Sequence, residues 1–315
     1  SFQSLAREIA GLNGIDQTHH ASWGVSTKAV HGYQGRDPQT GSLSFPLYQT
    51  ATFAHPALGE STGFAYSRCG NPTVLELENT IAQLEGGLKA LAFASGTAAI
   101  STFLKQFRTG DCILACDDLY GGTYRLFHDV YEDRYGVEFH FIDFTDIAAV
   151  ERALAEHPNT KALFIETPTN PMMHVFDIKA LAELAHRNDA ILAVDNTFLT
   201  CYFQRPLELG ADVVVYSGSK YLCGHNDVIC GFLVIKDESL LQGTFMNYMS
   251  EGAAMPPFEA WLMLRSLKTL SVRLDRQQEN AQAISAFLKN HPHVTDVYYI
   301  GDKDHPRIGL TERQC

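Results

Sequence analysis

The sequence predicts an α/β protein built on a mostly parallel β-sheet with helices on both faces. Short apolar runs recur along the chain and alternate with helical stretches such as 147–156 and 178–188. The runs are LAFA (91–94), ILAC (113–116), FHFI (139–142), ALFIE (162–166), ILAVD (191–195), VVVYS (213–217) and FLVI (232–235). Buried strands that alternate with helices are typical of a parallel sheet covered on both sides.

Two helical patterns flank these runs. The segment TVLELENTIAQLEG carries apolar residues at 74, 75, 77, 81 and 84, the spacing of one helix face. After Pro256-Pro257 the pattern predicts one long helical stretch over 258–290. We expect this stretch to leave the sheet domain and to open a second domain.

The first 64 residues read differently, because they are rich in Gly, His, Thr and Gln and show little periodicity. A segment without a core of its own must lie against the main body or a second subunit, so we expect an extended arm. The sequence thus predicts an arm over 1–64, a main sheet domain over 65–255 and the start of a smaller C-terminal domain over 256–315. Little sequence is left for that last part, because the chain turns polar after 300 and reaches only Cys315.

Composition excludes several classes of partner. The chain has 24 basic and 36 acidic residues, a net charge of −12, which argues against nucleic acid and anionic membranes. No apolar run approaches the roughly 20 residues of a membrane span, and the start SFQSLAREIAGLNG lacks a signal-peptide layout. The seven cysteines show no zinc-knuckle spacing, so we expect reduced structural thiols, no metal site and a cytoplasmic protein.

The ends of the predicted strands carry the candidate chemistry, since ligands of parallel sheets bind beyond the carboxyl ends of the strands. Asp195 ends one apolar run, and Lys220 follows the next run 25 residues later (220 − 195). This pair suits pyridoxal phosphate. The lysine would form the Schiff base, and the aspartate would hold the pyridine nitrogen protonated so that the ring accepts carbanion electrons.

A third strand end adds a phosphate site. The run LAFA leads into Ser95-Gly96-Thr97, where a tight turn opens a helix whose free N–H groups suit a phosphate. Ser217 and Ser219 would add hydroxyl donors. Taken singly, each of these residues has an ordinary structural explanation. The stretch 217–220 also spells the S-x-x-K of serine acyl-enzymes, but the companion S-D-N and K-T-G motifs are absent.

Longer motifs identify a family. They are YSR (66–68) with GNPT (70–73), FASGTAAI (93–100), DLYGGTYRLF (118–127), ETPTNP (166–171), VDNTF (194–198), QRPLELGAD (204–212) and SGSKYLCGHND (217–227). With them the chain resembles the Cys/Met-metabolism family of pyridoxal-phosphate enzymes, the trans-sulfuration group. The resemblance implies the aspartate-aminotransferase fold (fold type I), with a truncated C-terminal α/β domain.

The resemblance assigns three catalytic residues. It implies that Lys220 is the Schiff-base lysine and the general acid and base. It implies that Asp195 is the partner of the pyridine nitrogen, and that Tyr120 stacks on the ring and assists proton transfer.

Other residues are implied to hold the cofactor. Gly96 and Thr97 would bind the phosphate through their backbone, Ser217 and Ser219 through their hydroxyls, and Asn170 would lie near the phenolic oxygen of the ring.

Two further cofactor residues imply an assembly. In the family the counterparts of Tyr66 and Arg68 reach the phosphate of a neighbouring subunit. The resemblance therefore implies a homo-oligomer with a dimer as the smallest active unit and a tetramer as the usual form.

The implied reaction is γ-replacement or γ-elimination on homoserine-derived amino acids, of the cystathionine γ-synthase or γ-lyase type. O-acylhomoserine, cysteine and cystathionine are the implied substrates. An O-acetylhomoserine sulfhydrylase and a truncated, inactive subunit are the alternatives. Ala65 stands where cystathionine enzymes usually have an acid, and Gly122 stands where methionine γ-lyases have a cysteine. The arginine that binds the substrate carboxylate is expected beyond Cys315.

Overall fold

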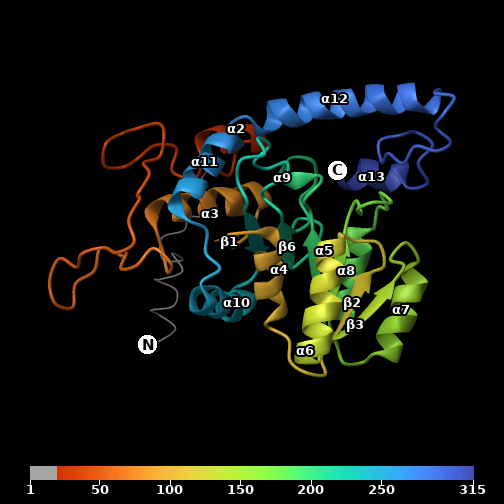
Figure 1. Ribbon diagram of the computed structural model, residues 1–315, viewed down its shortest axis with the longest axis horizontal. Coiled ribbons are helices and arrows are strands. Elements are labelled where there is room, and N and C mark those ends of the chain that lie inside the picture. Colours follow the sequence, from red (N-terminus) through yellow and green to blue (C-terminus); the bar gives the residue numbers. More distant parts are fainter. Residues whose placement is uncertain (1–19) are drawn as a thin grey trace. The chain divides into compact units, whose positions relative to one another are not determined.

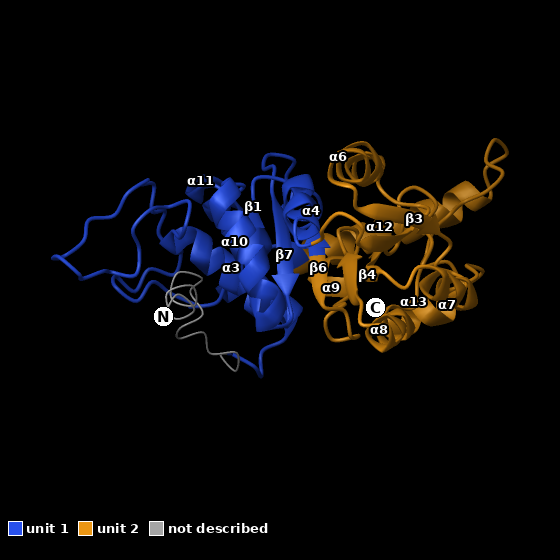
Figure 2. Ribbon diagram, turned by 90° about the horizontal axis from the view of Figure 1, so that it is seen from below, with its two compact units in different colours: residues 1–106, 215–270 blue, residues 107–214, 271–315 orange. Residues whose placement is uncertain are grey.

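The computed structural model describes residues 20–315, so the first part of the predicted arm, 1–19, lies outside the described residues. The chain divides into two compact units. Unit 1 comprises Ser1–Gln106 and Val215–Leu270, and unit 2 comprises Phe107–Val214 and Ser271–Cys315 (Figure 2). The predicted three-part division is a different partition of the chain and stays a prediction.

All seven predicted strands are present, with the order β1-β7-β6-β5-β4-β2-β3. Figure 1 labels β1, β2, β3 and β6 among them. Their bounds are β1 Lys89–Phe93, β2 Cys112–Cys116, β3 Glu138–Ile142, β4 Thr160–Glu166, β5 Ile191–Asp195, β6 Val213–Tyr216 and β7 Gly231–Ile235. In unit 2 the pairs β2–β3, β2–β4 and β4–β5 are parallel, and in unit 1 the pair β1–β7 is antiparallel. The predicted α/β class with a mostly parallel sheet is confirmed.

Unit 1 surrounds β1 and β7 with helices. They are α2 Val25–His31, α3 Pro72–Glu85, α4 Gly96–Leu104, α10 Glu238–Glu251 and α11 Pro257–Leu267. Helix α3 packs on β1, and one buried ion pair ties the two elements together. Glu78 of α3 accepts from the N–H of Ala92 at 3.0 Å and pairs with the Lys89 ammonium at 2.8 Å.

Unit 2 has helices on both faces of its strands. They are α5 Gly121–Arg125, the π-helix η1 Leu126–Glu132, α6 Asp133–Tyr135, α7 Ile147–Glu156, α8 Ile178–Arg187, α9 Thr200–Phe203, α12 Leu270–Lys289 and α13 Ile308–Gln314. Figure 2 shows α6 on one side of β3 and β4 and helices α7 and α8 on the other. On the α6 side, Phe127 of η1 stacks on Phe139 and meets Phe164 edge-on.

The helical stretch predicted over 258–290 consists of two helices, α11 and α12. The break lies at Lys268 and Thr269. The backbone N–H and the hydroxyl of Thr269 both bond to the carbonyl of Ser266, at 3.2 Å and 3.1 Å. A threonine side chain that takes a backbone carbonyl in this way competes with the continuing helix.

The N-terminal segment is also more structured than predicted, because it contains α2 and binds α3. The N–H groups of Tyr33 and Gln34 donate to Thr80 Oγ1 and Glu76 Oε1, both at 3.0 Å. The N–H of Tyr48 donates to Thr73 Oγ1 at 2.9 Å. Polar side chains of α3 therefore supply the hydrogen bonds that this segment cannot make by itself. Contact between this segment and a neighbouring subunit stays a prediction.

Glu76 gives unit 1 a pH-dependent stability. Burial raises the pKa of Glu76 from 4.5 to about 7, against the opposing effect of the Gln34 and Tyr33 N–H groups and Lys268. The unfolded chain therefore releases this proton before the folded chain does. The contribution of Glu76 to the free energy of unfolding is therefore highest below about pH 4.5. It falls by about 3 kcal/mol in all as the pH rises through about 7.

Glu76→Gln should remove this dependence. From about pH 5 to about pH 8 the free energy of unfolding of the wild type, measured in urea, should fall relative to the variant by about 2 to 3 kcal/mol. Glu60 is exposed, so Glu60→Gln is the matched control and should behave as the wild type. Parallel pH profiles for wild type and Glu76→Gln would show that Glu76 does not titrate in this range.

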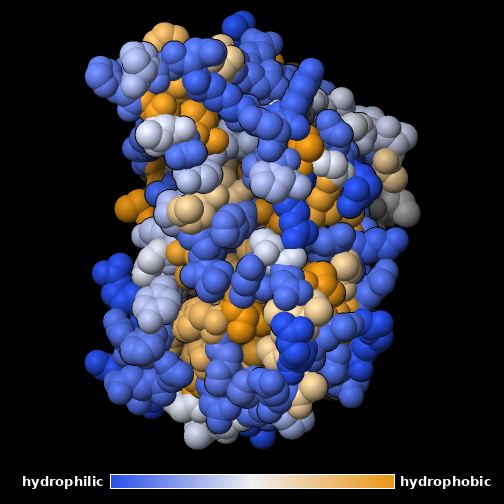
Figure 3. All heavy atoms as spheres, turned by 90° about the vertical axis from the view of Figure 1, so that its right-hand side faces the viewer, coloured by the Kyte–Doolittle hydropathy of each residue, from blue (hydrophilic) through white to orange (hydrophobic). Residues whose placement is uncertain are grey.

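The described surface is mainly hydrophilic on the face drawn in Figure 3, where apolar side chains appear in groups separated by polar ones. Within residues 20–315 no helix is both long enough and apolar enough to cross a bilayer.

Candidate active site

The residues predicted at the cofactor are divided between the two units. Unit 1 carries Tyr66, Arg68, Gly96, Thr97, Ser217, Ser219 and Lys220. Unit 2 carries Tyr120, Asn170 and Asp195.

In unit 1, the predicted phosphate site lies at the turn between β1 and α4. Ser95 caps α4, because its hydroxyl accepts from the N–H of Ala98 at 3.1 Å. The N–H groups of Gly96 and Thr97 stand at the start of α4 and have no acceptor within residues 20–315. Free N–H groups at a helix start bind anions well, because the helix dipole adds to their hydrogen bonds.

Gly96 brings this turn against the segment after β6. A Cβ at position 96 would lie 3.0 Å from both Cα and Cβ of Ser217, so any larger residue would have to push Ser217 away. The structure thus places Gly96, Thr97 and Ser217 together, as the sequence predicted.

Gly231 of β7 is a residue that sequence reasoning missed here. A Cβ at position 231 would lie 2.3 Å from the carbonyl oxygen of Ser95, which no side chain could tolerate. The sequence does contain a signal, because a glycine at the start of the apolar run FLVI marks a close approach of another backbone.

Ser219 and Lys220 occupy the turn that follows β6. The Ser219 hydroxyl accepts from the N–H of Cys230 at 2.8 Å and donates to its carbonyl at 3.2 Å. This hydroxyl is therefore engaged with the backbone beside β7, and it would have to rotate to donate to a phosphate. The side chain of Lys220 is exposed, and its backbone N–H donates to the carbonyl of Ser217 at 3.2 Å.

Asp195 ends β5 in unit 2, where it is 8% exposed. Its Oδ1 accepts from the N–H and the hydroxyl of Thr197, at 3.0 Å and 2.6 Å. Burial raises the pKa of Asp195, and the two Thr197 bonds only partly oppose this. A buried carboxylate held in this way is suited to a cationic partner, and a protonated ring nitrogen supplies one.

Glu166, which sequence reasoning did not single out, organises the other unit 2 residues. It ends β4 directly beside Asp195 in the strand register. Its Oε2 accepts from the N–H of Tyr120 at 3.0 Å, and its Oε1 accepts from the N–H of Asn170 at 2.7 Å. Burial, and then the neighbouring Asp195, raise the pKa of Glu166. The structure therefore brings Tyr120, Asn170 and Asp195 together around one acid.

The ring of Tyr120 lies over Gly122. A Cβ at position 122 would lie 2.3 Å from Cε1 and 2.8 Å from Cζ of that ring. A Cβ at the neighbouring Gly121 would have nothing within 4 Å of it. The missing side chain at 122 therefore decides where the Tyr120 ring lies, and the ring is 51% exposed and able to cover a ligand.

Gly122→Ala should displace the Tyr120 ring and lower kcat about tenfold, because the ring that is predicted to stack on the cofactor would be misplaced. Gly121→Ala adds the same methyl group into open space and should leave kcat unchanged. Steady-state kinetics of the two variants test this. Equal kcat values for both would show that the ring position is unimportant for the reaction.

Tyr66 and Arg68 lie together in unit 1. The Arg68 guanidinium stands 5.5 Å from the centre of the Tyr66 ring and donates to the carbonyl of Met249 in α10. Both side chains are exposed. Their predicted reach to a neighbouring subunit stays a prediction.

Unit 2 also contains a cluster with metal-ligating side chains, which the sequence did not reveal. Ligand atoms of Cys112, His140 and His157 lie within 4.8 Å of one another. The two imidazole rings are stacked, with centroids 3.7 Å apart and planes 21° apart. Metal ligation uses the in-plane lone pair of each ring, and two stacked rings cannot both direct one at the same ion. This cluster is therefore not a built metal site.

The residues present fit pyridoxal phosphate. The start of α4 has free N–H groups, and Gly96 there leaves almost no room for a Cβ beside Ser217. Such a helix start suits the phosphate. A buried acid without a cation among the described residues suits the ring nitrogen.

Comparisons with known proteins agree with this fit. The sequence profile of the "Cys/Met metabolism PLP-dependent enzyme" family matches residues 26–315. A Bacillus subtilis protein named cystathionine gamma-synthase/O-acetylhomoserine (thiol)-lyase is 46% identical over 88% of this chain and 74% of its own length. A cystathionine beta-lyase of the same organism is 43% identical over 90% of this chain and 72% of its own.

The solved structures agree as well. The crystal structure of cystathionine gamma-lyase from Lactobacillus plantarum, complexed with L-serine, has a TM-score of 0.89 and 42% identity, and covers 93% of this chain and 76% of that one. The predictions of the fold, of pyridoxal phosphate as cofactor and of a trans-sulfuration enzyme are confirmed. The chain belongs to the Cys/Met metabolism family of PLP-dependent enzymes.

Proposed function

We propose that this enzyme catalyses γ-replacement or γ-elimination on homoserine-derived amino acids, as a cystathionine γ-synthase or γ-lyase. O-acylhomoserine, cysteine and cystathionine are its proposed substrates. Relatives with 42% to 46% identity that carry synthase and γ-lyase names support this class of reaction. The observation that carries the proposal is the contact of the Gly96 turn with Ser217, three residues before Lys220.

When bound, pyridoxal phosphate would supply an electron sink for negative charge that develops on substrate carbon. The backbone of Gly96 and Thr97 would hold its phosphate, with Ser217 and Ser219 adding hydroxyls. Asp195 would keep the ring nitrogen protonated, and Asn170 would lie near the phenolic oxygen.

The proton transfers fall to Lys220. Its amine would accept the proton from the substrate Cα, and it is the general base that the family resemblance assigns to this position. Tyr120 would cover the ring, exclude water and assist the proton transfer. Glu166 would hold the backbone of Tyr120 and Asn170 through the two bonds described above.

A product assay tests the reaction. Purified enzyme receives O-acetylhomoserine or O-succinylhomoserine, with cysteine or with sulfide, beside a reaction with cystathionine alone. A synthase forms cystathionine from either O-acylhomoserine and cysteine. A γ-lyase releases cysteine, an oxoacid and ammonia from cystathionine. Absence of turnover with every substrate would contradict the proposal.

Direct sulfhydrylation of O-acetylhomoserine is the second candidate function. The Bacillus subtilis relative with 46% identity carries both activities in its name, which favours this candidate. Homocysteine formed from O-acetylhomoserine and sulfide would establish it in the same assay.

We also propose a homo-oligomer in the cytoplasm, with Arg68 reaching the phosphate held by a second copy. Arg68→Ala should then weaken cofactor retention about tenfold or more, because an arginine fork binds phosphate strongly. The exposed Arg152 provides the control, and Arg152→Ala should retain the cofactor as the wild type does.

Mixing Arg68→Ala with Lys220→Ala tests the assignment to a second copy, at a pyridoxal phosphate concentration too low for Arg68→Ala alone to be active. A hybrid dimer of Arg68→Ala and Lys220→Ala chains has one site with both Arg68 and Lys220 intact, if Arg68 acts across the interface. Activity should then reappear on mixing and refolding the two variants together. If Arg68 acts within its own chain, no site is complete and the mixture stays inactive.

A further inference from the structure

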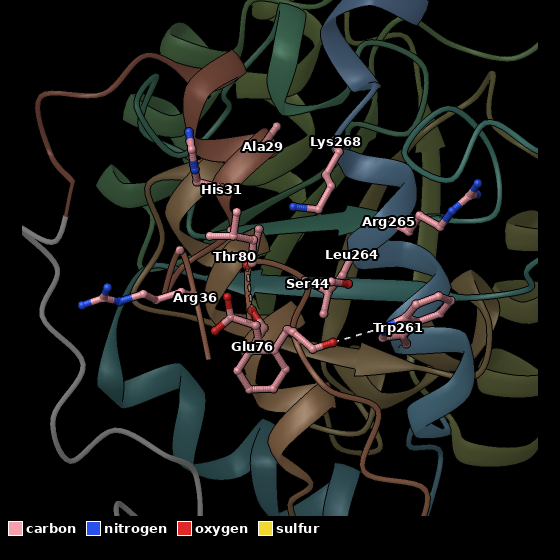
Figure 4. Close-up of a pocket in the computed structure, with 14 residues that line it drawn as sticks. Ala29, His31, Arg36, Ser44, Glu76, Thr80, Trp261, Leu264, Arg265 and Lys268 are labelled. Carbon is pink, nitrogen blue, oxygen red and sulfur yellow. Dashed lines mark hydrogen bonds between the residues drawn. The ribbon is translucent and has the colours of Figure 1, made fainter. Parts of the chain in front are cut away.

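Unit 1 contains a cavity of about 320 Å³ that none of the predicted cofactor residues line. It lies between the N-terminal segment 29–45, helix α3 and helix α11 (Figure 4). Its volume is at the lower end of the range of small-molecule sites in proteins.

The floor of the cavity holds a carboxylate with an unused oxygen. Glu76 is 3% exposed, and its Oε1 accepts from the N–H of Gln34 at 3.0 Å. Its Oε2 has no hydrogen-bond partner within residues 20–315. A buried carboxylate oxygen without a donor costs free energy, so this position favours a ligand that donates.

A cation faces the same space. Figure 4 shows Lys268 and Glu76 directed into the cavity, while Arg36 and Arg265 point away from it. The Lys268 ammonium donates to the carbonyl of Val30 at 2.5 Å, which leaves two protons for other acceptors. Lys268 and Glu76 form no ion pair with each other in the described chain. Each charge therefore lacks a full partner.

Part of the remaining wall is apolar, and His31, Ser44 and Thr80 line the cavity as well. Phe45, Leu43 and Leu264 line it together with the indole of Trp261. The Trp261 Nε1–H donates to the carbonyl of Phe45 at 3.2 Å, which fixes the indole against the N-terminal segment. An unbranched alkyl chain would bury its surface here.

We propose that this cavity binds a free α-amino acid with an apolar side chain, as a second site apart from the catalytic one. The ammonium of the ligand would donate to Glu76 Oε2, and its carboxylate would accept from Lys268. Its side chain would pack against Phe45 and Trp261. A zwitterion satisfies both unpaired charges at once, which an anion or a cation alone cannot do.

Titration of the holoenzyme with L-norleucine tests this proposal. Isothermal calorimetry measures binding, and tryptophan fluorescence reports the cavity. The chain has two tryptophans, so a Trp23→Phe background assigns the signal to Trp261. The visible absorbance of the cofactor, followed in parallel, reports the catalytic site separately.

Two analogues and three variants sharpen the test. N-acetyl-L-norleucine lacks the ammonium and L-norleucine amide lacks the carboxylate, so each should bind at least about tenfold more weakly. Glu76→Gln and Lys268→Met should weaken norleucine binding by similar factors. The exposed control Glu60→Gln should leave it unchanged. Circular dichroism shows whether each variant is folded. If Lys268→Met is not folded, Lys268→Arg, which keeps the charge, takes its place.

Three outcomes would overturn the proposal. The first is the absence of binding heat and of a Trp261 response. The second is equal affinity for norleucine and its acetylated form. The third is binding that changes only the cofactor absorbance and is indifferent to Glu76→Gln, which would place norleucine in the catalytic site alone.

Discussion

Lys220→Ala is expected to abolish the covalent attachment of pyridoxal phosphate and to lower turnover by roughly a thousandfold or more. The variant loses both the amine that condenses with the cofactor aldehyde and the base that moves the substrate proton. Turnover with O-acylhomoserine and cysteine, measured beside the visible spectrum, checks both effects.

Lys236→Ala is the matched control for this change. Lys236 is also an exposed lysine of unit 1, directly after β7, and its removal should alter neither turnover nor spectrum. If Lys220→Ala kept a borohydride-reducible imine with the cofactor, the assignment of the lysine would be wrong.

Asp195→Asn has the second largest expected effect. The amide keeps the shape of the side chain and the oxygen that accepts from Thr197, but it removes the negative charge that holds the ring nitrogen protonated. We expect kcat to fall by about 100- to 10,000-fold with the fold intact, because charge stabilisation at a buried site is a large part of catalysis.

Asp143 offers a close control for Asp195→Asn. It follows β3 in unit 2 and accepts from the N–H and hydroxyl of Thr145, at 2.7 Å and 2.9 Å, in the same Asp-x-Thr arrangement. Asp143 is exposed, however, so Asp143→Asn should leave kcat unchanged. A similar small effect of both substitutions would mean that Asp195 has only a local structural role.

The strands could be predicted from the sequence because each is a short apolar run with a polar residue or glycine at its end. The Gly96 turn and Asp195 could be placed for the same reason, since they directly follow such runs. The role of Glu166 could not be predicted in this way. It binds the backbone N–H groups of Tyr120 and Asn170, and backbone partners leave no mark on the residue types involved.

The cavity could not be predicted either. On periodicity alone, Lys268 belongs to a basic helix face that water should cover. The segment 29–45 folds back over α3 and α11 instead, so that Glu76 and Lys268 become buried or half-buried. This segment has no apolar period, and its position depends on hydrogen bonds from Tyr33 and Gln34 to Thr80 and Glu76.

The most direct test is to reduce the purified wild-type enzyme with borohydride, digest it and locate the pyridoxyl group by mass spectrometry. The account predicts a single modified peptide that contains residues 217–227, with the group on Lys220. Modification of another lysine, or an enzyme that carries no pyridoxyl group after incubation with pyridoxal phosphate, would contradict it.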